Sequence, residues 1–243
     1  GSISSSISSS KETVTVVPKT VLYMNLDYDI PERSNEDNLT AALSSLSMSL
    51  EQSDMSGMND ILANIDAAAT DPNIAGIFLE LSSIGTSSAN IEEIRDRLVK
   101  FRESGKFVIS YAETMAQNAY YLATASDEIY INPQGMLDIH GMASQVMFYK
   151  HLFDKLDIEM QIVRGPNNRF KSAVEPYFLD KMSDANREQY EKLLGSVWFK
   201  IVSDISATRG VSIERINELA DDLSLAFDAD VALEEGFIDG LLY

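Results

Sequence analysis

The stretch Ile74-Ala-Gly-Ile-Phe-Leu-Glu-Leu81 decides the fold. Its nearly continuous apolar run is typical of a strand buried in a parallel sheet. Apolar residues at helical spacing precede it over residues 58–69, and Asp71-Pro72 ends that pattern. A second helical pattern over residues 91–101 and a second strand pattern over residues 106–111 follow. This alternation predicts parallel strands joined by right-handed crossovers, and therefore an α/β fold.

The same alternation continues in both directions along the chain. We predict strands over residues 21–30, 128–132 and 158–164, and helices over residues 119–125, 146–156, 183–208, 212–222 and 228–236. Ser183 and Ser212 are the expected N-caps of two of these helices, and Gly210 is an expected terminator. We expect one domain over residues 19–243, preceded by residues 1–18 as a flexible serine-rich tether or an artificial chain end.

Composition excludes several kinds of chemistry. The chain has 243 residues, 45% of them apolar, with 19 basic and 38 acidic residues and a net charge of −19. This charge disfavours nucleic acid as a partner, because it would repel a phosphate backbone. The lack of cysteine excludes disulfides, thiolate zinc sites and a cysteine nucleophile. His140 and His151 are the two histidines, so a multi-histidine metal centre is hard to build, and we expect no metal and no cofactor.

A lysine stands among apolar residues in Phe170-Lys171-Ser172-Ala173-Val174-Glu175-Pro176. A lysine can act as a general base without histidine if its surroundings lower its pKa from about 10.4 towards 7, which costs roughly 4 kcal/mol. The alternative is an ordinary ion pair on a helix surface between Lys171 and Glu175, which are four residues apart.

This lysine segment resembles that of signal peptide peptidase A, or protease IV, in its long two-repeat form. Three further segments match the family in the same order: Asn118–Pro133, Leu137–Met142 and Tyr149–Leu156. The resemblance implies the spiral, largely parallel sheet of the crotonases and caseinolytic protease subunits, flanked by helices. It also implies that Lys171 is the general base of a Ser/Lys dyad.

The position that matches the family's serine nucleophile is occupied by Gln117. In the long form, the first repeat gives the lysine, and the second gives the serine and most of the oxyanion hole. The resemblance therefore implies that this chain is the N-terminal half of a split site, inactive alone, with no nucleophile of its own.

The resemblance also implies the setting of the whole protein. We expect a peptidase that degrades cleaved signal peptides or other extended apolar peptides. It would be a homo-oligomer, anchored in the bacterial inner membrane by a segment absent from this chain, with the catalytic part on the periplasmic face. Its C-terminal half would be a further partner of this chain. The sequence itself contains no run of about 20 apolar residues and no signal-peptide pattern.

Other residues are weaker candidates for chemistry. Ser172 follows Lys171 directly, but adjacent helical residues do not face each other, so a polar helix-start role is favoured. Asp138 and His140 alternate in a possible strand and could form a hydrogen-bonded pair, and Gly141 after them is typical of a turn.

The acidic residues at 221–222, 228–230 and 234–235 are expected to be solvated helix ends. The competing function is a non-catalytic crotonase-like module that oligomerises or binds peptides, and an acyl-CoA enzyme ranks last.

Overall fold

The computed structural model describes residues 16–33 and 56–243. Most of the expected tether, residues 1–15, lies outside the described residues. The chain divides into two compact units, one formed by Gly1–Ile131 with Leu242 and the other by residues 132–241 with Tyr243. The domain boundary expected near residue 18 stays a prediction.

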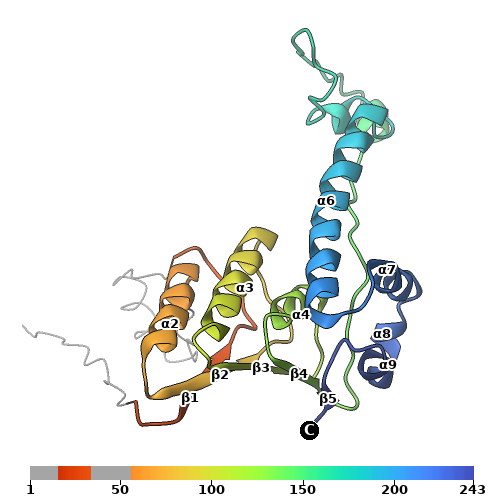
Figure 1. Cartoon of the computed structure of the whole chain (residues 1–243). Coiled ribbons are helices and arrows are strands. Elements are labelled where there is room, and N and C mark those ends of the chain that lie inside the picture. Colours follow the sequence, from red (N-terminus) through yellow and green to blue (C-terminus); the bar gives the residue numbers. More distant parts are fainter. Residues whose placement is uncertain (1–15, 34–55) are drawn as a thin grey trace, which may run out of the picture. The chain divides into compact units, whose positions relative to one another are not determined.

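The first unit contains four parallel strands in sequence order with helices between them. These elements are β1 (Thr20–Asn25), α2 (Met58–Thr70), β2 (Ile74–Glu80), α3 (Ser88–Arg102), β3 (Phe107–Ala112), α4 (Gln117–Ala123) and β4 (Glu128–Ile131). Ile77 in β2 is paired with Leu22 in β1 and with Val108 in β3. The three helices lie along one face of the strands (Figure 1). The predicted α/β class, a parallel sheet flanked by helices, is confirmed.

The core of the first unit lies between this sheet face and the helices. Side chains alternate along the strands, so that Ile77, Leu79 and Val108 are fully buried, while Phe78 and Phe107 on the other face are partly exposed. The helical stripe predicted from residues 91–101 is also buried, at Ile91, Ile94, Leu98 and Phe101.

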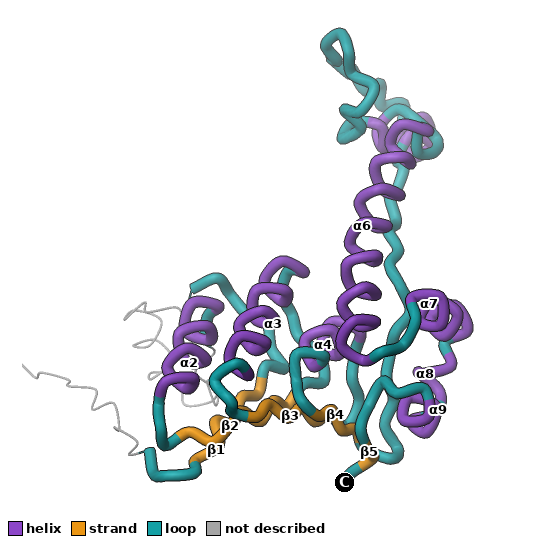
Figure 2. Tube along the Cα trace, in the orientation of Figure 1, coloured by secondary structure: helices purple, strands orange, loops and turns teal. Residues whose placement is uncertain are grey.

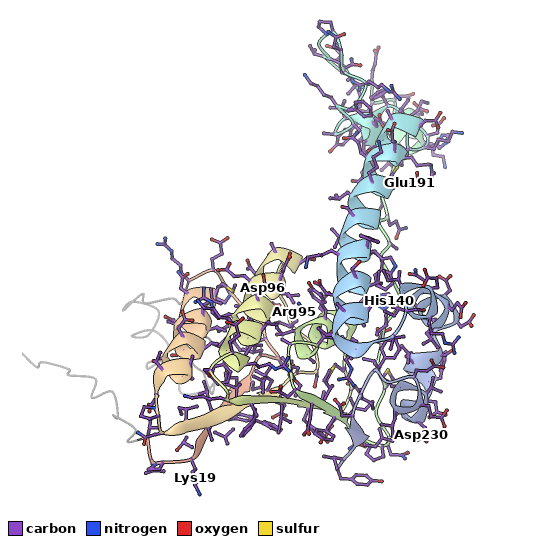
Figure 3. The ribbon with its side chains drawn as sticks, viewed as in Figure 1. Lys19, Arg95, Asp96, His140, Glu191 and Asp230 are labelled. Atoms are coloured by element: carbon purple, nitrogen blue, oxygen red, sulfur yellow. The ribbon has the colours of Figure 1, made fainter. Side chains whose placement is uncertain are left out.

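One charged residue is part of this interior. Arg95 of α3 is 6% exposed, and its Nε donates to the Thr124 hydroxyl at 3.0 Å. Its guanidinium also lies 5.2 Å from the centre of the Tyr121 ring. Figure 3 labels Arg95 on the side of α3 towards α4, whereas Asp96 is nearer the outside. The arginine therefore joins α3 to α4 through a hydrogen bond and a cation–π contact.

The second unit is mainly helical. Its elements are α5 (Lys150–Lys155), the 3₁₀ turn η1 (Glu175–Tyr177), α6 (Asp184–Arg209), α7 (Ile213–Asp222), α8 (Ser224–Phe227), α9 (Ala229–Glu234) and the short strand β5 (Gly240–Leu241). The predicted caps are confirmed: the hydroxyls of Ser183 and Ser212 accept backbone N–H groups at the starts of α6 and α7. Gly210 ends α6 with φ = 75°, a conformation that glycine adopts without strain. Within this unit, α5 and η1 lie near the N-terminal end of α6 (Figure 1).

Two elements predicted between residues 146 and 164 differ from the structure. The helix is shorter, covering Lys150–Lys155, and residues 158–164 form no strand. Figure 2 shows this extended segment as a loop. No described residue exchanges backbone hydrogen bonds with residues 159–163, and Val163 is 97% exposed. The strand prediction for residues 158–164 is therefore wrong, because a β-prone pattern forms a strand only where a neighbouring strand is present to pair with.

We predict that Leu98→Ala lowers the free energy of unfolding by about 2–5 kcal/mol, because it leaves a cavity in the core. Val99→Ala on the next position of α3 is the control, since Val99 is exposed and its truncation should change stability by less than about 0.5 kcal/mol. Urea unfolding followed by circular dichroism measures both variants. Equal losses would contradict the described packing of α3.

Packing of α6 against α7 has its own probe. Trp198, the single tryptophan, donates its indole N–H to Asn217 Oδ1 at 2.8 Å. We predict that Asn217→Ala destabilises this pair of helices by about 0.5–1.5 kcal/mol and shifts the tryptophan emission, because the indole loses its acceptor. Asn217→Asp keeps an acceptor oxygen and should retain the emission of the unsubstituted protein. Urea unfolding followed by tryptophan fluorescence gives both readouts.

Candidate active site

Lys171 lies in a loop of the second unit, residues 165–174, called the lysine loop below. The side chain of Lys171 is exposed, and its ammonium makes no hydrogen bond or ion pair with any described residue. A cavity of about 580 Å³ opens beside it. Its lining is mixed: Val163, Phe170 and Val174 contribute apolar surface, while Arg164, Asn168 and Ser172 contribute polar groups.

The ion pair considered for Lys171 and Glu175 is absent. Glu175 begins η1, and only 2% of its surface is exposed. Its carboxylate accepts hydrogen bonds from the backbone N–H of Ser183 at 3.2 Å, from the Ser183 hydroxyl at 2.6 Å and from Asn186 Nδ2 at 3.1 Å. A buried carboxylate requires such donors, and the N-terminal end of a helix favours its negative charge. Glu175 therefore holds the end of the lysine loop against the start of α6.

The other end of the loop is held by Arg164. Its Nη2 donates to the backbone oxygens of Asn168 at 3.0 Å and of Lys171 at 2.8 Å. The N–H of Lys171 itself donates to the Asn168 oxygen at 2.9 Å. The guanidinium also lies 5.7 Å from the centre of the Phe178 ring, beyond η1. One side chain thus joins the start of the loop to the lysine.

Aromatic rings support η1 on its remaining side. Tyr149, Phe153 and Tyr177 form a cluster with ring centres 6.2–6.3 Å apart, and the Tyr149 N–H donates to the Pro176 oxygen at 2.7 Å. This cluster joins α5 to the residue that follows the Glu175-Pro176 pair. The matched segments Tyr149–Leu156 and Phe170–Pro176 are therefore in contact.

Gln117 belongs to the first unit. It is the first residue of α4, is 9% exposed, and follows Ala116, whose N–H donates to the Ser82 oxygen at 2.9 Å. A glutamine amide at this position is no nucleophile. The role of Lys171 and the match of Gln117 to a serine position both stay predictions.

Ser172 does not start a helix; its carbonyl accepts the Glu175 N–H at 2.9 Å, before η1. The expected pair of Asp138 and His140 is confirmed, with Oδ1 and Nδ1 2.8 Å apart. Both side chains are exposed, by 40% and 53%, so the pair lies at the surface. Gly141 has φ = 80°, as a turn requires.

The acidic clusters have structural partners at two points. Arg215 donates to Glu235 from Nε at 3.1 Å and from Nη2 at 2.6 Å, and this pairing lowers the pKa of the Glu235 carboxyl. Asp228 caps α9 by accepting the N–H of Asp230.

Within residues 16–33 and 56–243, no group of three or more His, Asp or Glu side chains is placed to hold a metal ion. No helix in these ranges is both long and apolar enough to cross a membrane.

Sequence reasoning missed the residues that hold the lysine loop. Arg164 gave no signal, because a single arginine beside a glycine is common on protein surfaces. Glu175 gave a weak signal: it stands between the apolar Val174 and Pro176, where a carboxylate has no obvious need to face solvent. Asn186 was read only as part of a helix.

Comparison with known proteins identifies the family of the chain. The model of "Peptidase family S49" matches residues 100–243. "Protease 4" of Salmonella typhi is 37% identical over 158 residues, which are 65% of this chain and 25% of that protein. "Protease 4" of Haemophilus influenzae is 32% identical over 211 residues, or 86% of this chain and 34% of that protein. "Serine protease SPPA, chloroplastic" of Arabidopsis thaliana is 30% identical over 154 residues, or 62% of this chain and 22% of that protein.

Solved structures were also similar at low identity. A membrane-bound stomatin-specific protease is 15% identical with a TM-score of 0.44, over 92% of this chain and 76% of that one. An enoyl-CoA hydrotase/isomerase family protein from Silicibacter pomeroyi is 13% identical with a TM-score of 0.44, over 93% and 73%. The chain spans about a quarter to a third of the curated relatives' length. Because the family model covers more than half of the chain and includes the lysine loop, the chain belongs to peptidase family S49.

Proposed function

We propose that this chain supplies the general base, Lys171, to a Ser/Lys endopeptidase whose serine is carried by a second repeat outside the chain. The observation that carries the proposal is an exposed ammonium without a polar partner among the described residues. Its loop is held by Arg164, which donates to the Lys171 oxygen, and by Glu175 directly after the loop, which accepts from the Ser183 hydroxyl. A lysine used only for stability would be expected to pair with one of the many carboxylates of this acidic chain.

The chemistry requires Lys171 in its neutral form. The amine accepts the proton of the serine hydroxyl as the serine oxygen attacks the peptide carbonyl carbon. The resulting ammonium returns that proton to the leaving amine, and water then releases the acyl group from the serine. An exposed lysine remains hydrated, so the incoming repeat would also have to cover it and remove that water.

The substrates proposed are cleaved signal peptides and other extended apolar peptides. Support comes from the apolar side chains of Val163 and Phe170 in the mixed lining beside Lys171, and from the peptidase family. A membrane anchor before the catalytic part, location on the periplasmic face of the bacterial inner membrane, and assembly into a homo-oligomer belong to the same proposal. They rest on the resemblance to the long-form enzymes.

A second candidate is a non-catalytic module that binds peptides or oligomerises. Its supporting observation is Gln117, a buried amide at the position matched to the nucleophile. The two candidates differ in the effect of Lys171 on peptide hydrolysis by the longer protein. Hydrolysis requires Lys171 if the lysine is the general base, and does not depend on Lys171 if this chain is a non-catalytic module.

We predict no hydrolysis of an apolar peptide by this chain alone, and hydrolysis by a longer protein in which the second repeat follows it. Lys171→Ala in the longer protein should lower kcat by about 10²–10⁴-fold, the usual contribution of a general base. Gln117→Ala is the matched control and should leave kcat within about threefold, because an amide takes no part in proton transfer. Hydrolysis by the isolated chain would reveal a nucleophile within it, and activity that survives Lys171→Ala would favour the non-catalytic module.

We also predict that Lys171→Arg is as inactive as Lys171→Ala. Arginine keeps the positive charge and most of the side chain length, but it does not lose its proton in proteins. Rate measurements at pH 7 to 10 test this, because recovered activity in the arginine variant would show that charge alone is needed. Circular dichroism of both variants serves as the control for folding.

A further inference from the structure

The backbone oxygens of the lysine loop are bound from outside the loop at several successive positions. Arg164 donates to the oxygens of Asn168 and Lys171, Gln189 of α6 donates to that of Phe170 at 3.2 Å, and the N–H of Glu175 donates to that of Ser172 at 2.9 Å. A surface loop normally leaves such groups to water. Here the backbone on both sides of Lys171 is fixed by the protein.

One nitrogen of the Arg164 guanidinium is left without a hydrogen bond in the described part of the chain, which costs free energy. Its Nε is buried and has no hydrogen-bond partner among the described residues. A buried unsatisfied donor costs roughly 1–3 kcal/mol. The two bonds from Nη2 and the contact with Phe178 offset that cost, but an uncharged side chain would avoid it altogether.

Glu175 complements Arg164 at the other end of the loop. Its three acceptor bonds go to Ser183 and Asn186, at the first turn of the 26-residue helix α6. A long helix is a rigid support, and sites carried by such supports are more precise than sites on free loops. Arg164 therefore fixes the backbone at the lysine itself, and Glu175 fixes it four residues later.

We propose that Arg164 and Glu175 are positioning residues, which hold the backbone of Lys171 so that its amine meets a nucleophile from another segment. This inference rests on the proposed function, since it concerns the same lysine. Neither residue touches the reacting atoms in this role. We call the contacts of Arg164 and Glu175 the clamp. Loss of either residue's contacts should misplace the amine and lower kcat, with little effect on substrate binding.

The first experiment follows hydrogen–deuterium exchange of this chain by mass spectrometry. Arg164→Met keeps the aliphatic stem and removes the donors, and it should speed exchange of peptides covering the Lys171 and Glu175 amides by at least about tenfold. Arg169→Met is the matched control, since Arg169 contacts Glu188 at 3.5 Å and the Phe170 ring and donates to no loop carbonyl among the described residues. Equal exchange in the two variants would overturn the role of Arg164. Glu175→Gln should also speed exchange, and unchanged exchange there would overturn the role of Glu175.

The second experiment measures hydrolysis by the longer protein. Arg164→Ala and Glu175→Gln should each lower kcat about 10–100-fold while KM changes less than about threefold. Added guanidinium at millimolar concentration should restore part of the kcat of Arg164→Ala and none of that of Lys171→Ala. Unchanged kcat in both variants, or losses that appear only in KM, would overturn the proposal.

The two experiments separate this inference from the proposed function. Faster exchange in Arg164→Met together with full activity of Lys171→Ala would leave the clamp intact and refute the catalytic role of the lysine. The opposite result, unchanged exchange with an inactive Lys171→Ala variant, would support the catalytic lysine and refute the clamp.

Discussion

A buried carboxylate must be surrounded by donors, and the lysine-bearing part of the second unit is arranged to satisfy that requirement for Glu175. Ser183 supplies two donors and Asn186 a third, which fixes where α6 begins relative to η1. The Ser183 hydroxyl also accepts the Asn186 N–H and so caps the helix. The same side chains of Glu175, Ser183 and Asn186 therefore determine where the helix starts and where the loop ends. The loop that precedes Glu175 is held in a defined position as a result.

The first unit depends on a different constraint, the burial of one sheet face. Ile77 and Val108 are fully buried on this face. Arg95 is accommodated in the same interior through its hydrogen bond to Thr124 and its contact with the Tyr121 ring. A scaffold held by apolar contacts does not depend on any one catalytic side chain for its shape.

Much of the fold could be predicted because its signals are local. The runs that form β2 and β3, the stripe from Ile91 to Phe101 and the serine caps act within a few residues. The strand expected at residues 158–164 was wrong because pairing depends on a second segment that periodicity cannot supply. Within the candidate site, resemblance drew attention to Lys171, but Arg164 and Asn186 could not be found, because their partners lie 4 to 11 residues away across irregular backbone.

An exposed lysine and a fixed backbone are compatible if the base and the nucleophile come from different segments. If the loop is already ordered when the segment with the nucleophile binds, part of the entropy cost of ordering the loop does not fall on that binding step. Leaving the ammonium hydrated until then avoids the larger cost of burying an unpaired charge in the unassembled chain. Arg164 binds the loop backbone and Glu175 binds the start of α6, and neither binds the amine. They can therefore order the loop in advance while the ammonium stays hydrated. A carboxylate bound to the amine itself would stabilise the charged ammonium, whereas a general base has to act as the neutral amine.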